Sequence, residues 1–160
     1  MKTYKQFLTP KLFKEVYEYA EQSTYREVED NIYNFKGNNI QGELKDNIEQ
    51  TFRQYGLKGL ISILRVQQID PTIQVVTAYH RHGEMDRENV VCFLNDNFTG
   101  GEFEYLVEDN VQVKPTPNTA IVFGPTLRHR VLPVTEGVRY TLVAFLEESS
   151  YLNKQEKSLI

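Results

Sequence analysis

The stretch Tyr79-His80-Arg81-His82-Gly83-Glu84-Met85-Asp86 holds two of the three histidines in this 160-residue chain. Its even-numbered positions all carry side chains that can bind a metal ion: His80, His82, Glu84 and Asp86. In an extended strand, residues two apart share a face, so a strand here would present imidazoles and carboxylates to one side. The third histidine, His129, lies in a second β-rich segment. A His-x-acid pair with one distant histidine is typical of a facial Fe(II) site with open coordination positions.

Short β-rich runs separated by turn residues fill the chain from residue 57 onward. The expected strands cover residues 60–66, 72–79, 89–94, 102–107, 111–114, 119–123, 128–132 and 139–146. Their separators, such as Asp70-Pro71 and Gly100-Gly101, are rich in residues that form turns. Eight short strands without a helical pattern between them predict a mainly β protein, an antiparallel sandwich or jelly roll (double-stranded β-helix).

Two amphipathic helices are expected before the strands. Thr9-Pro10 is a helix start, with Thr as the N-cap and Pro in the first turn, and apolar residues then recur at helical spacing. Residues 40–55 repeat an apolar side chain at every fourth position and end before Gly56, a residue suited to a helix C-terminus. We therefore expect one domain over 1–160, with a helical buttress (1–56), a barrel core (57–147) and a C-terminal tail (148–160).

Strand alternation predicts which side chains face the interior. In the segment 128–132, His129 and Val131 share one side, with the arginines on the other. In the last strand Arg139 shares a face with Thr141 and should point where His129 points. A charge inside a barrel is costly unless it is paired, so Arg139 predicts an anionic ligand.

The composition restricts the class of function. The chain has 18 Lys and Arg against 22 Asp and Glu, a net charge of −4, which argues against non-specific binding to nucleic acid or a membrane surface. No apolar run is long enough to span a bilayer, and no signal-peptide core follows the N-terminus, so we expect no export and a cytoplasmic location. The single cysteine, Cys92, lies in an apolar run and is expected to be buried, and no intramolecular disulfide can form.

The second half of the chain, residues 79–146, resembles the 2-oxoglutarate/Fe(II)-dependent dioxygenases, especially their prolyl-4-hydroxylase-like branch. The resemblance rests on motifs in a fixed order. His82-Gly83-Glu84 matches that family's His-x-Asp/Glu, and it is followed by Phe93-Leu94-Asn95-Asp96 and Gly100-Gly101-Glu102. The most specific piece is the last: His129-Arg130-Val131-Leu132-Pro133-Val134-Thr135-Glu136-Gly137-Val138-Arg139-Tyr140-Thr141.

This resemblance implies a role for each matching residue. His82, Glu84 and His129 would hold Fe(II), Arg139 would bind the distal carboxylate of 2-oxoglutarate, and Thr141 would add a hydroxyl donor. The implied reaction uses O2 to hydroxylate a C–H bond and releases succinate and CO2, with ascorbate as a reductant. The implied substrate is a peptidyl or free amino acid, such as proline, or another small molecule.

Several assignments stay open at this level. Glu84 stands where Asp is commoner, and only residues 85–89 separate it from the next strand, so a shifted register would make His80 or Asp86 a ligand instead. Otherwise four residues are candidates for hydrogen bonds to the metal ligands or for contacts with the substrate: His80, Asp86, Tyr79 and Gln74. Side chains on the strands before the motif could line the pocket: Arg65, Gln67 and Gln74.

Two other functions compete with this one. A cupin-type isomerase or dioxygenase that does not use 2-oxoglutarate is suggested by His80-x-His82 followed by Asp86. The two classes share a barrel architecture, but a cupin has no need of an inward arginine at Arg139. The third hypothesis is a metal-free jelly roll that acts as a binding module.

Overall fold

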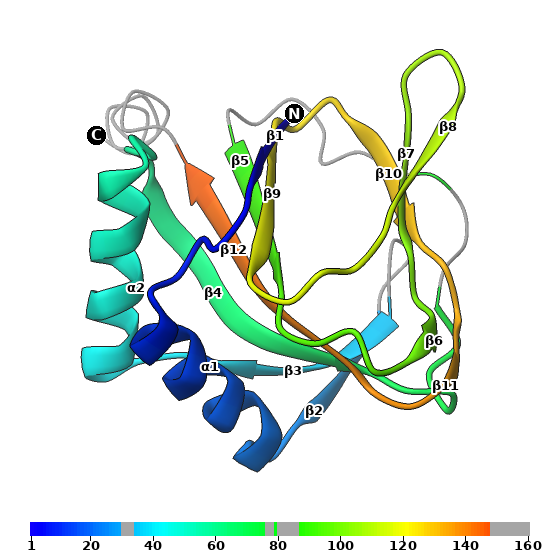
Figure 1. Cartoon of the computed structure of the whole chain (residues 1–160), viewed down its shortest axis with the longest axis horizontal. Helices are drawn as coiled ribbons and strands as arrows, with labels where there is room; N and C mark the ends of the chain where they lie inside the picture. Colours follow the sequence, from blue (N-terminus) through cyan, green and yellow to red (C-terminus); the bar gives the residue numbers. More distant parts are fainter. Residues whose placement is uncertain (30–33, 76–78, 80–86, 148–160) are drawn as a thin grey trace, which may run out of the picture.

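The computed structural model describes residues 1–29, 34–75, 79 and 87–147 (Figure 1). Within these ranges the chain forms two helices and three antiparallel sheets, one large and two small. The helices are α1 (Pro10–Gln22) and α2 (Gly42–Gln54). The strands are β1 (Lys2–Tyr4), β2 (Arg26–Glu29), β3 (Asn34–Asn39), β4 (Leu60–Ile69), β5 (Arg87–Phe93), β6 (Thr99–Gly100), β7 (Phe103–Leu106), β8 (Asn110–Val113), β9 (Thr119–Phe123), β10 (Arg128–Val131), β11 (Val134–Glu136) and β12 (Arg139–Glu147).

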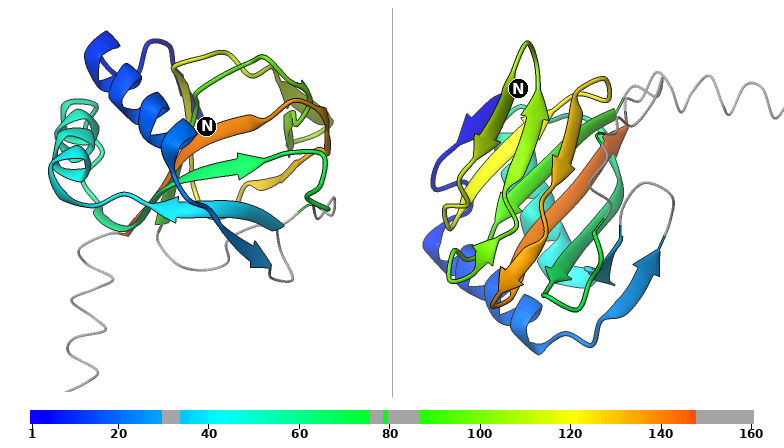
Figure 2. Two further views of the ribbon diagram at one scale, coloured as in Figure 1. Left: turned by 90° about the horizontal axis from the view of Figure 1, so that it is seen from below. Right: turned by 90° about the vertical axis from the view of Figure 1, so that its right-hand side faces the viewer.

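A seven-stranded antiparallel sheet forms the major layer, in the order β1-β9-β5-β12-β4-β3-β2. Both helices cover one face of it, and the smaller sheets lie over the other (Figures 1 and 2). The largest apolar core fills the space between the helices and the major sheet, with Val16, Ile48, Phe52, Val66 and Leu142 fully buried. This is the expected mainly β architecture with two buttressing N-terminal helices.

Both helices begin and end where the local sequence favours it. The Thr9 hydroxyl accepts a hydrogen bond from the Leu12 amide (3.3 Å), and Pro10 occupies the first turn. Helix α2 ends before Gly56, whose φ of 77° is in the region that favours glycine. No helix in the described part of the chain is long and apolar enough to cross a membrane.

The second layer of the barrel is a three-stranded sheet, β10-β7-β8, with the short pair β11-β6 beside it. A smaller core lies between this layer and the major sheet, built on Phe93, Phe103, Ile121 and Phe123. Strand β10 pairs with β7 so that His129 lies opposite Tyr105. The two layers therefore enclose an interior into which β10 and β12 both direct side chains.

Two parts of the fold differ from the sequence-based expectation. The expected strand at 72–79 was wrong for residues 72–75, because a turn begins at Pro71, where the Thr72 amide donates to the Asp70 carboxylate (2.9 Å). Residues 76–78 lie outside the described ranges. The expected helical buttress also contains β1, β2 and β3, which extend the major sheet at its two edges. The remaining expected strands are all present, with ends shifted by a few residues.

Cys92 is fully buried on β5, as expected. Burial raises the pKa of its thiol to about 12, so at pH 8 only about one thiol in 10⁴ is ionised. We therefore predict that the native protein does not react with iodoacetamide and that one thiol reacts after denaturation. Mass spectrometry of samples alkylated with and without denaturant checks this, and rapid native labelling would contradict the burial of Cys92.

Candidate active site

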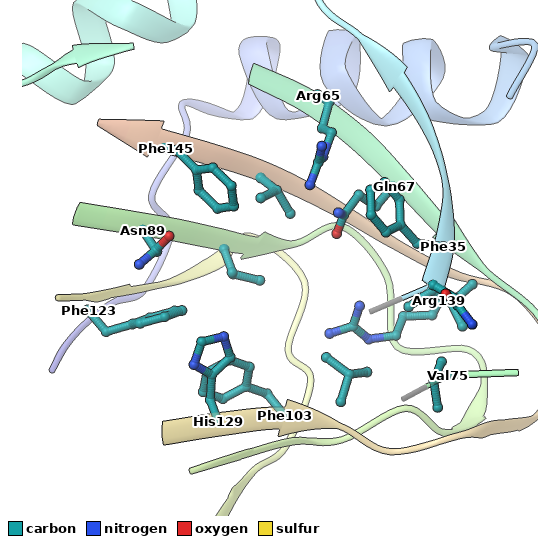
Figure 3. Close-up of a pocket in the computed structure, with 15 residues that line it drawn as sticks. Phe35, Arg65, Gln67, Val75, Asn89, Phe103, Phe123, His129, Arg139 and Phe145 are labelled. Carbon is teal, nitrogen blue, oxygen red and sulfur yellow. The ribbon is translucent and has the colours of Figure 1, made fainter. Parts of the chain in front are cut away.

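A pocket of about 80 Å³ opens between the two layers of the barrel (Figure 3). Its polar lining comes from five strands and consists of Asn34, Arg65, Gln67, Asn89, His129 and Arg139. Its apolar lining is aromatic and β-branched and includes Phe35, Val91, Phe103, Phe123, Val131, Val143 and Phe145. Residues from β10 and β12 thus meet in one cavity, as strand alternation predicts.

His129 is held rigidly at one end of this pocket. It is 5% exposed, and its ring is stacked on Phe103 (centroids 5.5 Å apart) and edge-on to Phe123 (4.7 Å). Its Nδ1 lies 2.9 Å from the Leu127 carbonyl oxygen, which can only accept a hydrogen bond, so Nδ1 carries the proton. In the neutral form of the ring the lone pair is then on Nε2, the arrangement that a metal-binding histidine requires.

Arg139 supplies a buried positive charge to the same pocket. Its side chain is 2% exposed, its Nε donates to the Gly101 carbonyl (2.9 Å), and its guanidinium carbon lies 5.6 Å from the centre of the Phe93 ring. Its Nη2 has no hydrogen-bond partner among the described residues. Burial lowers the pKa of the guanidinium to about 10, which leaves it charged at neutral pH. A buried cation with an unused donor fits an anionic ligand.

Thr141 follows Arg139 on the same face of β12 and is fully buried. Its Oγ1 also has no hydrogen-bond partner in the described part of the chain. It lies between Gln67 of β4 and Phe93 of β5 in the sheet register. Arg139 and Thr141 thus both lie beside Phe93, but only Arg139 is among the residues that line the pocket. Their role in binding a cosubstrate stays a prediction.

The other predicted metal ligands, His82 and Glu84, lie outside the described residues, and so do His80 and Asp86. Within the described ranges no three His, Cys, Asp or Glu side chains are grouped closely enough to hold a metal ion. A metal at His129 would therefore need ligands from beyond the described residues, where the predicted ligands His82 and Glu84 lie. The assignment of these ligands stays a prediction.

Tyr79 and Gln74 are described, and neither lines the pocket. The Tyr79 hydroxyl donates to the Glu104 carboxylate, and the Arg130 guanidinium lies 4.3 Å from the centre of its ring. Arg130 also donates to Glu104 (2.8 Å), and these hydrogen bonds lower the pKa of that carboxyl. Tyr79 thus fixes the chain to β7 and β10 immediately before the segment 80–86. Gln74 is exposed, and its carbonyl accepts from Asn34 (2.7 Å).

Arg65 and Gln67 do line the pocket, from β4. The Arg65 guanidinium carbon lies 4.3 Å from the centre of the Phe35 ring and 5.7 Å from that of Phe145. Figure 3 shows Arg65 near the upper edge of the pocket and Arg139 on its right-hand side. The pocket therefore contains two arginines, of which Arg139 is the more buried.

Sequence reasoning missed two residues of the site. Gly101 was interpreted as a turn residue within a family motif and given no role at the site, yet its carbonyl accepts a hydrogen bond from Arg139, and a Cβ there would lie 2.9 Å from Arg139 Cδ. Asn89 was placed on a strand without a role, although its side chain is fully buried in the pocket lining. The alternation Asn89, Val91, Phe93 could have shown a polar residue on an inward face.

Comparison with known proteins gives a family and a fold. A family model described as the 2OG-Fe(II) oxygenase superfamily matches residues 69–147. A search of curated proteins found no significant match.

Solved structures similar to this chain include several prolyl hydroxylases. A prolyl-4-hydroxylase from Pseudomonas putida has a TM-score of 0.70 at 16% identity, over 92% of this chain and 91% of that one. A prolyl hydroxylase from Trichoplax adhaerens, in complex with a hypoxia-inducible-factor peptide, has a TM-score of 0.74 at 14% identity, over 93% and 84%. A viral collagen prolyl hydroxylase from Paramecium bursaria Chlorella virus-1, in its 2OG complex, has a TM-score of 0.67 at 14% identity, over 92% and 94%. These likenesses show the double-stranded β-helix fold.

Proposed function

Because this chain belongs to the 2OG-Fe(II) oxygenase superfamily, we propose that its pocket hydroxylates a C–H bond of a peptidyl or free amino acid, such as proline, or of another small molecule. As a member, the protein is an oxygenase whose metal is Fe(II) and whose cosubstrate is 2-oxoglutarate. The superfamily match favours this function over the cupin and binding-module alternatives. Ascorbate as a reductant stays a prediction.

One observation carries the assignment of roles within the pocket: a buried, charged arginine shares the cavity with a histidine whose Nε2 keeps its lone pair. We assign His129 to the metal together with His82 and Glu84, since two imidazoles and a carboxylate are the facial set that Fe(II) oxygenases use. We assign Arg139 and Thr141 to the distal carboxylate of 2-oxoglutarate, because both have buried donors without a partner among the described residues.

The residues of this chain would bind and orient the reactants. When bound, Fe(II) supplies the oxidation in which one oxygen atom of O2 enters succinate, the other enters the product hydroxyl, and CO2 leaves. Arg139 would fix the cosubstrate at one end with charge-assisted hydrogen bonds in a dry site, where these bonds are strong. The Leu127 carbonyl would keep the His129 ring in the metal-binding tautomer.

The amino-acid substrate class rests on the fold likeness to prolyl hydroxylases and on the lining of the pocket. Aromatic and β-branched side chains surround the cavity between Arg139 and His129. Such an apolar surface suits an aliphatic group of the substrate. We propose to test this by measuring succinate release with free amino acids, with proline-containing peptides and with no addition, each with and without Fe(II). Stimulation by one class identifies the substrate, and a lack of Fe(II)-dependent succinate in every arm would contradict the proposed function.

Gly101 gives a prediction about how Arg139 is held. Gly101 has a φ of 68°, and a Cβ there would meet both Arg139 and Val134 at about 3 Å. We predict that Gly101→Ala lowers the affinity for 2-oxoglutarate about 10-fold, because the methyl group displaces the guanidinium. Calorimetric titration checks this.

The matched control is Gly56→Ala, at a similar φ of 77° but with no atom within 4 Å of the added Cβ. Both substitutions should destabilise the fold by about 1–2 kcal/mol through the positive φ. Only Gly101→Ala should lower the affinity for 2-oxoglutarate. Equal affinities in the two variants would show that Gly101 acts on stability alone.

A further inference from the structure

Asn89, at the start of β5, has a side chain that is fully buried in the lining of the active-site pocket. Neither its Oδ1 nor its Nδ2 has a hydrogen-bond partner among the described residues. Burying an amide without partners costs stability, so this amide needs a partner beyond the described residues. Figure 3 shows the Asn89 amide at the edge of the cavity, on the side of His129 and Phe123.

A second buried asparagine, Asn95, shows what a structural amide looks like in this protein. Its Nδ2 donates to Asn97 Oδ1 and to the Val138 carbonyl (both 2.7 Å), and its Oδ1 accepts from the Tyr140 amide (2.9 Å). Its hydrogen bonds to Val138 and Tyr140 tie this loop to the start of β12. Asn89 is more deeply buried than Asn95, yet its side chain makes no hydrogen bond among the described residues.

The sheet register places Asn89 at the opposite end of the pocket from Arg139. Asn89 pairs with Phe145, which lies six residues beyond Arg139 on the same face of β12, a separation of about 20 Å along the strand. Asn89 also pairs with Phe123 of β9, whose ring contacts that of His129. The long Arg139 side chain spans part of this distance, and a ligand of a few carbon atoms would span the rest.

We propose that Asn89 binds the 1-carboxylate of 2-oxoglutarate, with Nδ2 donating to a carboxylate oxygen at the His129 end of the pocket. This inference rests on the proposed function, and it adds a residue that fixes the end of the cosubstrate remote from Arg139. An amide suits this position because it donates a hydrogen bond without adding a charge beside a metal site. Oδ1 remains as an acceptor for a water molecule or a substrate donor.

Two ligands and two substitutions test the inference. Asn89→Leu keeps a similar shape and removes both polar atoms, and Asn89→Asp replaces the donor with a negative charge. The ligands are 2-oxoglutarate and 4-oxopentanoate, which has a methyl group in place of the 1-carboxylate. Affinities are measured by anaerobic calorimetry on the Fe(II) protein, with 4-oxopentanoate measured by displacement.

We expect Asn89→Leu to lower the affinity for 2-oxoglutarate about 10-fold, which is the effect of losing one charge-assisted hydrogen bond. Asn89→Asp should lower the affinity by more. The affinity for 4-oxopentanoate should change less than about threefold in Asn89→Leu, since that ligand lacks the group in question. Equal losses for both ligands, or an unchanged affinity for 2-oxoglutarate, would overturn the inference. If the wild-type protein itself binds no 2-oxoglutarate, the proposed function fails rather than the role of Asn89.

Thermal unfolding of the ligand-free protein gives a separate readout. Asn89→Leu should raise Tm by a few degrees, because it removes a buried amide that the described residues leave unpaired. Asn95→Leu should lower Tm, because it leaves the Tyr140 amide and the Val138 carbonyl without their partner. A fall in Tm for Asn89→Leu as large as that for Asn95→Leu would assign Asn89 a structural role instead.

Discussion

We predict that replacing Arg139 with methionine will lower the affinity for 2-oxoglutarate by about 100-fold or more and will stabilise the ligand-free protein. The affinity falls because two charge-assisted hydrogen bonds are lost, each contributing about 1.5–3 kcal/mol. The ligand-free protein gains stability because Arg139 is a fully buried cation whose Nη2 has no partner among the described residues. Calorimetric titration and thermal unfolding of the same preparations measure both effects.

The matched control for Arg139 is Arg65→Met, which removes an arginine from the same pocket. It should retain most of the affinity for 2-oxoglutarate, whereas Arg139→Lys should keep only part of it, because an ammonium lacks the planar fork. If Arg65→Met loses as much affinity as Arg139→Met, the assignment of the distal carboxylate to Arg139 is wrong.

The pH dependence of cosubstrate binding follows from the same burial. Burial lowers the pKa of Arg139 to about 10, so in the ligand-free protein the guanidinium loses its charge as the pH rises through this value. We expect 2-oxoglutarate affinity to fall above about pH 10. The penalty for burying the charge is present below pH 10 and disappears at higher pH, so this residue by itself favours folding more as the pH rises.

We predict that replacing His129 with alanine will lower the affinity for the metal by at least about 100-fold. Removing a residue that only hydrogen-bonds to a metal ligand already lowers metal affinity about 10–100-fold, and removing the ligand itself should lower it by more. Electron paramagnetic resonance of Mn(II), titrated into the protein as a probe, measures the affinity directly and does not depend on turnover.

The control for His129 is Phe103→Leu, because His129 is also a packing residue. Phe103 stacks on the imidazole at 5.5 Å, and its replacement disturbs the same core without removing a nitrogen ligand. Phe103→Leu should lower Tm and retain Mn(II) binding, while His129→Ala should lower both. Retention of the wild-type Mn(II) affinity in His129→Ala would contradict the assignment of His129 to the metal.

The alternation of residues along strands predicted much of the site. It placed Arg139 and Thr141 on one face of the last strand and His129 and Val131 on one face of β10, and all of these except Thr141 line the same pocket. This succeeds because the two-residue period is fixed by backbone geometry, whatever the neighbouring strands are.

The strand β3 could not be predicted from its own residues. It reads Asn34-Phe35-Lys36-Gly37-Asn38-Asn39, and asparagine and glycine are depleted in strands. Tertiary contacts override this preference: Lys36 and Asn38 pair with Gln68 and Val66 of β4, and Phe35 is 2% exposed. Conversely, Ile73 and Val75 suggested a strand, but the Asp70-Thr72 hydrogen bond forms a turn there.

The roles of Asn89 and Gly101 were also beyond the sequence. Gly101 supports Arg139 through its carbonyl, a contact between residues 38 positions apart. Asn89 is recognised only when its burial and its lack of described partners are both known. Strand alternation could have shown only that Asn89 faces inward, whereas its partners and the contact of Gly101 with Arg139 depend on the three-dimensional neighbourhood.

The most direct measurement is an anaerobic titration of the metal-free protein with Fe(II) and then with 2-oxoglutarate, followed by visible absorption. The assignment of His82, Glu84 and His129 to the metal, with Arg139 on the cosubstrate, predicts a metal-to-ligand charge-transfer band that saturates at one 2-oxoglutarate per chain. Binding of Fe(II) without a band on addition of 2-oxoglutarate would contradict this account of the pocket, and so would a failure to bind Fe(II) at all.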